Sequence, residues 1–314
     1  MSVPSGEPAG TGISPDRRDD LPMTRYLTGL QSLVGSFDAL LLDQWGVLHD
    51  GHRAYPGAID CLTRLRAAGM GVIVLSNSGK SGEENARLIG TMGFPRALFD
   101  AVVSAGDDAR DAILNRDDDF LRALGRRCLL LSRESDRGLA DGLGLDVLID
   151  PAQVDQADFL LLMSMQAPLQ SVAAWEPLLR RAVARGLPMV CANPDLARVT
   201  PDGSLLEAPG LVAGRYADLG GAVRLHGKPD PRIYRTCLRR LQCPRHRVVA
   251  VGDSLHHDIL GARGAGVASL LVAAGVHRDE LGCNADGIAD AARAERLFDD
   301  AGVRPDMVAA RFTW

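Results

Sequence analysis

Short, continuous apolar runs alternate with stretches of helical spacing along most of the chain. Residues 37–43 (FDALLLD) and 70–78 (MGVIVLSNS) are apolar runs that end in polar residues. This pattern is typical of strands buried on both faces of a parallel sheet. In residues 57–69 and 81–93, apolar positions recur at the spacing of one helix face. The repeated order of strand and helix predicts a parallel α/β sheet with right-handed crossovers.

Two local signals support these helices. Gly69 follows the last periodic position of the first, where glycine commonly ends a helix in the left-handed conformation. Ser81 precedes the second, and Glu84 stands three residues further on. A serine and a glutamate at this spacing predict a capping box, in which each side chain binds the other residue's backbone N–H.

The alternation continues beyond these elements, which predicts a second, smaller α/β unit in the middle of the chain. Further strands are predicted at residues 102–106, 127–132, 146–150, 158–164, 187–193, 247–254 and 267–275, and further helices near 171–185, 231–241 and 257–264. Residues 193–210 are rich in turn-forming residues.

These elements predict an interrupted core with an inserted unit. We assign residues 36–109 and 222–285 to the core and residues 110–221 to the inserted α/β unit. Residues 1–35 begin with a stretch rich in Gly, Pro, Ser and Asp and are expected to be a disordered leader. Residues 286–314 are expected to form a helical extension, to which we assign no role.

Composition excludes several classes of function. The chain is 46% hydrophobic and 24% charged, with a net charge of −5, so no electrostatic reason favours nucleic acid or an anionic membrane as a partner. No apolar run approaches the roughly 20 residues of a membrane span, and the N-terminus lacks the apolar segment of a secretory signal. The six scattered cysteines are expected to be buried, reduced thiols of a cytoplasmic protein.

The positive charges are strongly biased toward arginine. Lys80 and Lys228 are the only lysines among 35 Lys and Arg residues. A lysine kept under this bias is expected to serve where a compact ammonium suits better than a planar guanidinium. A solvated loop lysine remains an equal alternative for Lys80.

Polar residues follow several predicted strands. They are Asp43, Ser76 with Asn77, and Asp253, while Lys228 follows a further candidate strand end and Asp258 lies five residues beyond Asp253. Ligands bind beyond the carboxyl ends of the strands in open parallel sheets. Three carboxylates brought together there would repel one another, and Mg²⁺, which prefers oxygen ligands, would relieve that repulsion. Lys228 and the Ser76 hydroxyl would then hold phosphate oxygens.

The chain resembles the haloacid dehalogenase-like superfamily in four segments that occur in the expected order. They are LLLDQWGVLHDG, LSNS, GKPDP and VGDSLHHDI. The insert between LSNS and GKPDP, with CANPD near its end, is similar to the class IIA branch, which includes sugar-phosphate, nucleotide, pyridoxal-phosphate and nitrophenyl-phosphate phosphatases. The resemblance implies a Rossmann-like core with an inserted C2-type cap, acting as a Mg²⁺-dependent phosphatase on a small phosphorylated metabolite.

The resemblance also implies a role for each matching residue. Asp43 would be the nucleophile that forms an aspartyl-phosphate, and Lys228 would neutralise charge on it and on the phosphate. The other implied roles are phosphoryl binding by Ser76, Asn77 and Ser78, metal binding by Asp43, Asp253, Asp258 and the Trp45 backbone carbonyl, and contacts from the cap by Asn193 and Asp195. Asn193 and Asp195 fit simple turn formation equally well. Members of this branch often dimerise through the cap, so a homodimer is one assembly to consider.

Trp45 departs from the family pattern. Phosphatases of the superfamily usually carry a second aspartate at this place, which protonates the leaving group and then activates water. An indole does neither, and general acid–base help is worth about 10²–10⁴-fold in rate. Poor leaving groups such as sugar alkoxides should suffer most. His49, or otherwise Asp50, is a candidate replacement acid in the same loop, although His49 also fits a packed core position.

Two rival functions remain open from the sequence. Dehalogenases of the superfamily carry an aromatic residue at the position of Trp45 and need no metal. The acids in GDSLHHD are spaced as in metal-dependent members, which favours a phosphatase. The second rival is a binding or regulatory protein that kept the fold and lost turnover.

Overall fold

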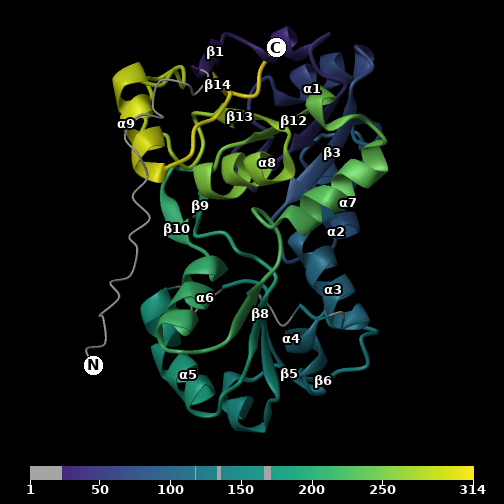
Figure 1. Cartoon of the computed structure of the whole chain (residues 1–314), viewed down its shortest axis with the longest axis vertical. Coiled ribbons are helices and arrows are strands. Elements are labelled where there is room, and N and C mark those ends of the chain that lie inside the picture. Colours follow the sequence, from purple (N-terminus) through teal and green to yellow (C-terminus); the bar gives the residue numbers. More distant parts are fainter. Residues whose placement is uncertain (1–22, 117, 133–135, 166–170) are drawn as a thin grey trace, which may run out of the picture.

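The structure is a computed structural model that describes residues 23–314 apart from residues 117, 133–135 and 166–170. Within the described residues the chain builds two parallel sheets, one above the other along the long axis (Figure 1). The larger sheet holds the strands nearest both ends of the described chain. The smaller one is built from the middle of the chain, as the alternation of strands and helices predicts.

The larger sheet has seven strands, and every neighbouring pair is parallel. Their order is β1 (Arg25–Leu27), β14 (Met307–Ala309), β13 (Ala268–Val272), β12 (Val248–Gly252), β2 (Ala39–Leu42), β3 (Gly71–Ser76) and β4 (Ala101–Ser104). Strands β2, β3 and β4 succeed one another outward in one direction, and β12, β13 and β14 do so in the other. The strand order therefore reverses between β2 and β12, and ligands bind at such a reversal in open α/β sheets.

Strand β2 is buried on both faces, as its continuous apolar run predicts. Leu40 and Leu42 pack in one core cluster with residues of α1 (Ala58–Ala67) and α2 (Gly82–Thr91). Leu41 packs in a different cluster with residues of α7 (Pro231–Leu241) and α8 (Leu260–Ala265). The two helical layers therefore fix the end of β2 from both sides.

The predicted helix boundaries near β3 are confirmed. The Glu84 N–H donates to Ser81 Oγ at 3.2 Å, and the Ser81 N–H donates to Glu84 Oε2 at 3.3 Å, so the capping box is complete. Gly69, just after α1, has the left-handed φ of +85°. The helix predicted near residues 257–264 is α8, preceded by a π-helical turn at Leu255–Ile259.

The smaller sheet has five parallel strands and helices on both faces. Its order is β11 (Val223–Leu225), β8 (Met189–Cys191), β7 (Phe159–Leu162), β5 (Arg127–Leu131) and β6 (Asp146–Leu148). Helices α5 (Val172–Ala184) and α6 (Pro209–Asp218) cover one face. Helix α3 (Ala105–Asn115), followed by α4 (Asp119–Arg122), packs on the other. This unit is the cap.

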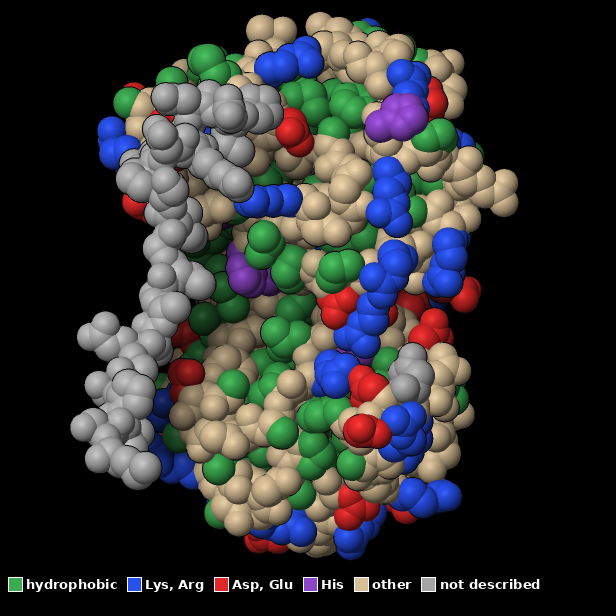
Figure 2. All heavy atoms as spheres, in the orientation of Figure 1, with side chains coloured by type: hydrophobic (Ala, Val, Ile, Leu, Met, Phe, Trp, Pro, Cys, Tyr) green, Lys and Arg blue, Asp and Glu red, His purple; other side chains and the backbone are tan. Residues whose placement is uncertain are grey.

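A short antiparallel hairpin, β9 (Ala197–Val199) and β10 (Leu205–Glu207), extends from the cap toward the core (Figure 1). It falls within residues 193–210, where the sequence predicts only turns. Helices α3 and α6 are also absent from the sequence prediction. Basic side chains run down one side of the face in Figure 2, over the arginine-rich α7.

Three predicted boundaries need correction. Residues 25–27, placed in a leader, form β1 and pair with β14, with Arg25 opposite Met307; residues 1–22 lie outside the described part of the chain. The C-terminal segment contains the expected helix, α9 (Ala291–Ala301), but then adds β14 to the core sheet. Strand β11 joins the cap sheet, so the cap extends beyond residue 221. Each of these strands has three residues, and a local pattern does not show which sheet such a strand joins.

Candidate active site

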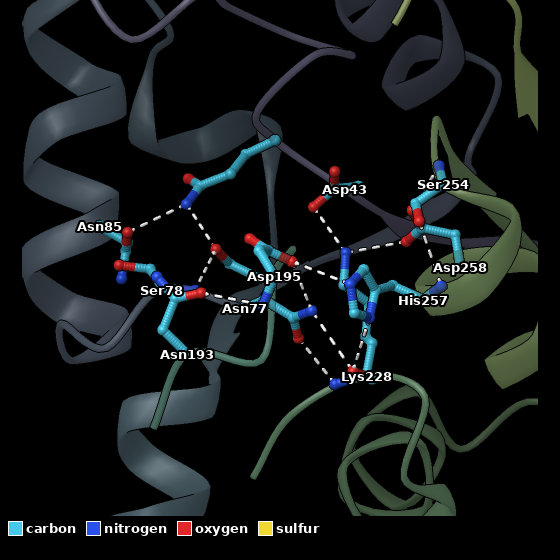
Figure 3. Close-up of polar contacts among 12 residues, drawn as sticks. Asp43, Asn77, Ser78, Asn85, Asn193, Asp195, Lys228, Ser254, His257 and Asp258 are labelled. Carbon is cyan, nitrogen blue, oxygen red and sulfur yellow. Dashed lines mark hydrogen bonds and ion pairs between the residues drawn. The ribbon is translucent and has the colours of Figure 1, made fainter. Parts of the chain in front are cut away.

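Four charged side chains meet beyond the strand ends at the reversal between β2 and β12. Lys228 Nζ donates to Asp43 Oδ1 at 2.7 Å and to Asp258 Oδ1 at 2.8 Å, so the ammonium lies between two carboxylates (Figure 3). Asp253, at the end of β12, completes the group. All four residues are buried, and Lys228 is only 2% exposed. The predicted strand-end residues therefore do come together.

The three carboxylates fit a divalent cation. Asp43, Asp253 and Asp258 each offer an oxygen, and these oxygens all lie within 4.8 Å of one another. Asp253 accepts one backbone hydrogen bond, from the Val276 N–H at 2.9 Å. Burial, and then the charges of Asp43 and Asp258, raise the pKa of Asp253 well above its usual range. Three carboxylates around one ammonium leave a surplus of negative charge that an oxygen-binding Mg²⁺ would neutralise.

Glycine at residue 46 makes room for this arrangement. Gly46 has a φ of +81°, and a Cβ there would lie 2.0 Å from Asp253 Oδ2. A side chain at residue 46 would therefore displace one of the three carboxylates. The turn after β2 thus brings the backbone directly against the Asp253 side chain.

The charges of Asp43 and Lys228 are strongly linked. Burial raises the pKa of the Asp43 carboxyl to about 7, although the Lys228 ammonium lowers it. For Lys228, burial favours the neutral amine, but the Asp258 and Asp43 carboxylates outweigh it and hold the pKa well above its usual value. Lys228 is therefore charged at neutral pH and holds one oxygen of Asp43, which leaves the other oxygen for a ligand.

Asn77 connects this group to the cap. Its Oδ1 accepts a hydrogen bond from the Lys228 N–H at 2.7 Å, and its Nδ2 donates to Asp195 Oδ1 at 2.8 Å (Figure 3). Asp195 precedes the β9–β10 hairpin, and its Oδ1 lies 3.7 Å from His257 Nε2. One buried amide therefore links the Lys228 backbone to the cap segment that carries Asp195.

The remaining predicted phosphate and cap residues lie close by. Ser76 Oγ accepts from Gln44 Nε2 at 2.6 Å and from the Ser78 N–H at 3.1 Å. The Ser78 hydroxyl accepts from the Lys80 N–H at 3.2 Å. Asn193 Oδ1 accepts from the Asp195 N–H at 3.2 Å. Asn193 thus stabilises the turn that carries Asp195, and the prediction that it contacts substrate stays a prediction.

Trp45 turns toward the cap hairpin. Its Nε1–H donates to the Val199 carbonyl at 2.8 Å, and the Arg198 guanidinium lies 5.9 Å from its ring centroid. The indole also covers Gly51, where an added Cβ would lie 2.2 Å from the ring. Trp45 is therefore a contact between the core loop and the cap, and metal binding by its backbone carbonyl stays a prediction.

His49 and Asp50, the candidate replacement acids, are engaged in the loop itself. His49 Nδ1 accepts from the Gly51 N–H at 3.0 Å, and its ring packs edge-on against Trp45. Burial lowers the pKa of His49 to about 4, so the ring is neutral at pH 7. Asp50 Oδ1 accepts from the backbone N–H groups of His52 and Arg53, each at 2.9 Å. These contacts favour a structural role for both residues.

Lys80 lies apart from the four charged residues. Its ammonium pairs with Asp136 at 2.6 Å and with Glu84 at 3.4 Å. The arginine bias singled out both lysines, but only Lys228 lies in the candidate active site.

Sequence reasoning missed Gln44 and Asn85, which stand behind Ser76. Gln44 Nε2 donates to Asn85 Oδ1 at 3.0 Å as well as to Ser76. One signal was present in the sequence, because Asn85 lies four residues before the buried Ile89 on the same face of α2. A polar residue within a buried helical stripe calls for a partner.

Comparisons with known proteins find that the chain is similar to haloacid dehalogenase-like hydrolases. Models described as haloacid dehalogenase-like hydrolase match residues 40–146 and 174–266, and one described as HAD-hydrolase-like matches residues 225–313. D-glycerol 3-phosphate phosphatase of Mycobacterium tuberculosis is 28% identical over 252 residues, which cover 79% of this chain. The matched region spans 66% of that relative, slightly less than two thirds of its length.

Solved structures agree with the fold. A haloacid dehalogenase-like hydrolase from Brucella suis is 27% identical, with a TM-score of 0.75 over 91% of this chain and 100% of that one. Glycerol phosphate phosphatase from Mycobacterium tuberculosis, solved in complex with magnesium, has a TM-score of 0.58. That match covers 79% of this chain and 72% of the other. Since the two sequences are only 24% identical, the match supports the fold and no more. In the described residues, no helix is long and apolar enough to span a membrane.

Proposed function

Because this chain belongs to the haloacid dehalogenase-like hydrolases, we propose that it is a Mg²⁺-dependent phosphatase. Its substrate is a small phosphorylated metabolite, and Asp43 carries the phosphoryl group as an aspartyl-phosphate. The observation that carries the proposal is the buried group of three carboxylates around Lys228 at the strand reversal.

In this proposal Asp43 is the nucleophile, and Lys228 and Ser76 bind the phosphoryl group. Lys228 holds Asp43 Oδ1, and the second oxygen of Asp43 attacks phosphorus as the bond to the leaving oxygen breaks. The Ser76 hydroxyl and Lys228 hold oxygens of the transferring group. Water then attacks the phosphorus, the bond between phosphorus and the Asp43 oxygen breaks, and inorganic phosphate leaves with the protons of the water, which restores the carboxylate. Held by Asp43, Asp253 and Asp258, Mg²⁺ would neutralise charge on the phosphoryl oxygens.

The Trp45 side chain limits which leaving groups depart easily. The residue has no proton to give to the leaving oxygen, and His49 is neutral at pH 7 with its Nδ1 already bound. The phenolate of an aryl phosphate and the carboxylate of an acyl phosphate leave without a proton, whereas the alkoxide of a sugar phosphate needs one. We therefore expect efficient turnover of aryl or acyl phosphates and slow turnover of alkyl phosphates, with about a 10²–10⁴-fold disadvantage.

A cavity beside the site supports a small substrate. It has a volume of about 180 Å³ and lies between the β9–β10 hairpin and the core, with Thr200, Tyr55 and Arg278 among its lining residues. Gly275 and Val276 also line it, and the Val276 N–H binds Asp253. The volume has room for on the order of ten water molecules. That space suits a leaving group of a few carbon atoms.

The proposal is tested by phosphate release from p-nitrophenyl phosphate with Mg²⁺ and with excess EDTA. We expect turnover with Mg²⁺, its loss in EDTA, and a labelled phosphoenzyme in acid-quenched samples. Asp43→Asn should abolish both turnover and labelling, whereas Asp60→Asn, which changes an exposed carboxylate on α1, should leave both intact.

Halide release and ligand binding, measured beside phosphate release, separate the rivals. A dehalogenase would release halide from 2-haloacids in EDTA, and this result would overturn the phosphatase proposal. A binding protein without catalysis would take up a phosphate analogue but release no phosphate over days. The three buried carboxylates favour the metal-dependent phosphatase over the dehalogenase.

A further inference from the structure

We propose that Gln44 is a positioning residue that turns the Ser76 hydroxyl proton toward the bound phosphoryl group. The proposal rests on the proposed function, because it concerns the phosphoryl site of that reaction. Gln44 directly follows the nucleophile, is only 5% exposed, and does not reach the charged residues around Lys228 through any hydrogen bond in the described chain.

The hydrogen bonds fix the direction of each amide in turn. Asn85 Nδ2 donates to the backbone carbonyls of Lys80 at 3.1 Å and Ser81 at 2.8 Å. Carbonyl oxygens only accept, so the amide nitrogen of Asn85 must face them and its Oδ1 must face Gln44. Gln44 must therefore present its nitrogen to Asn85, and the same nitrogen lies 2.6 Å from Ser76 Oγ.

These directions leave one place for the Ser76 proton. A hydroxyl oxygen has two lone pairs and one proton. Gln44 Nε2 and the Ser78 N–H both donate to Ser76 Oγ, so both lone pairs are occupied. The proton is then free to donate to an oxygen of the phosphoryl group. The backbone at the start of α2 thus sets the direction of the Ser76 hydroxyl proton through Asn85 and Gln44.

A purely structural role makes a different prediction. If Gln44 only tied α2 to the strand ends, its replacement would disturb the site whether or not residue 76 had a hydroxyl. If it acts through Ser76, its replacement should matter only when that hydroxyl is present. A double-mutant cycle with Ser76→Ala separates the two roles.

The experiment measures the affinity of the full chain for orthovanadate, a phosphate analogue, by calorimetry in Mg²⁺. Gln44→Met keeps similar volume and removes the donor, and Gln44→Glu replaces the donor with acceptors that would draw the Ser76 proton away. We expect a loss of roughly 3–10-fold for the first and about 10–100-fold for the second, because a hydrogen bond to a charged group is lost. In the Ser76→Ala background, neither change should alter the affinity by more than about twofold.

Equal losses in both backgrounds would overturn the role of Gln44 and leave the phosphatase proposal standing. Failure of the unmodified chain to bind orthovanadate would instead overturn the proposed function and this role together. Asn85→Ala is a second variant, for use if the Gln44 variants do not fold. It frees the Gln44 amide to rotate, so it should weaken binding only when Ser76 is present.

Discussion

Replacing Trp45 by aspartate should convert the chain into a better phosphatase for alkyl esters. The aspartate would supply the general acid and base that an indole lacks, worth about 10²–10⁴-fold, or roughly 3–5 kcal/mol in the barrier. The same change removes the hydrogen bond from Nε1 to the Val199 carbonyl and the cover over Gly51. The lost hydrogen bond costs about 1 kcal/mol, or roughly fivefold in cap closure.

A matched control isolates the two effects. The asparagine of Trp45→Asn has the size and shape of the aspartate of Trp45→Asp, and both variants lose the same contact to the cap. The asparagine amide, however, transfers no proton. The ratio of kcat/KM between the aspartate and asparagine variants therefore reports the acid alone. For glycerol 3-phosphate, an alkyl ester, we expect a ratio of about 10²–10⁴. For p-nitrophenyl phosphate, whose leaving group needs no proton, the ratio should be below about 10.

The assay follows phosphate release from both substrates at pH 7 in saturating Mg²⁺. A burst measured after acid quenching adds a second readout, because slow water activation in the unmodified chain should let the phosphoenzyme accumulate. A ratio near one for glycerol 3-phosphate would refute the reasoning. Another residue would then already supply the proton, or the residue 45 side chain would not reach the leaving oxygen.

Three further predictions concern stability. Lys228→Met leaves Asp43 and Asp258 buried beside each other without a cation, so urea denaturation in EDTA should show about 3–5 kcal/mol less free energy of unfolding; an unchanged midpoint would contradict the buried ion network. Asp253→Asn should raise the melting temperature in EDTA and abolish the stabilisation by Mg²⁺. For the unmodified chain this stabilisation is about 2.7 kcal/mol at a Mg²⁺ concentration of 100 times the dissociation constant. If Mg²⁺ still raised the melting temperature of the variant, Asp253 would not belong to the metal site. Burial lowers the pKa of His49 from 6.5 to about 4, so its contribution to stability is complete above pH 6.5 and is lost as the pH falls toward 4. From pH 7 to pH 5 this loss is about 2 kcal/mol, and His49→Gln should lack it in denaturation curves at the two pH values.

The sequence predicted most strands of the two parallel sheets, missed β1 and β14, and placed β11 in the core instead of the cap. A run such as residues 37–43 places apolar side chains on both faces of a strand, which fits a parallel sheet that is covered by helices on both sides. Strands β1, β11 and β14 have three residues each, and their pairing partners lie far along the chain. Their positions depend on tertiary pairing that local patterns do not contain. Helix α3 could have been found, because Ser104 and Asp107 form the same kind of capping box as Ser81 and Glu84.

The site shows the same division. The meeting of Asp43 and Asp253 was predictable because the parallel strands β2 and β12 place their carboxyl ends at one edge of the core sheet. Lys228 instead follows β11 of the cap sheet, so its arrival at this edge depends on how the two sheets sit together. The contact between Trp45 and Val199 joins residues 154 positions apart, and it depends on how the cap closes. The direction of the Gln44 amide depends on Asn85 and on the backbone carbonyls of Lys80 and Ser81, just before α2. Side-chain directions of this kind follow from three-dimensional neighbours, which the sequence does not specify locally.

Three consecutive residues after β2 thus face three parts of the molecule. Asp43 binds Lys228, Gln44 binds Ser76, and Trp45 binds the cap hairpin. An aspartate at residue 45 would add roughly 3–5 kcal/mol of help with a poor leaving group, whereas the Trp45 contact contributes about 1 kcal/mol from its hydrogen bond and further energy from packing. That exchange lowers activity only when the leaving oxygen needs a proton. With a leaving group that departs as a stable anion, tighter closure of the cap costs no catalysis, and such a substrate suits this loop best.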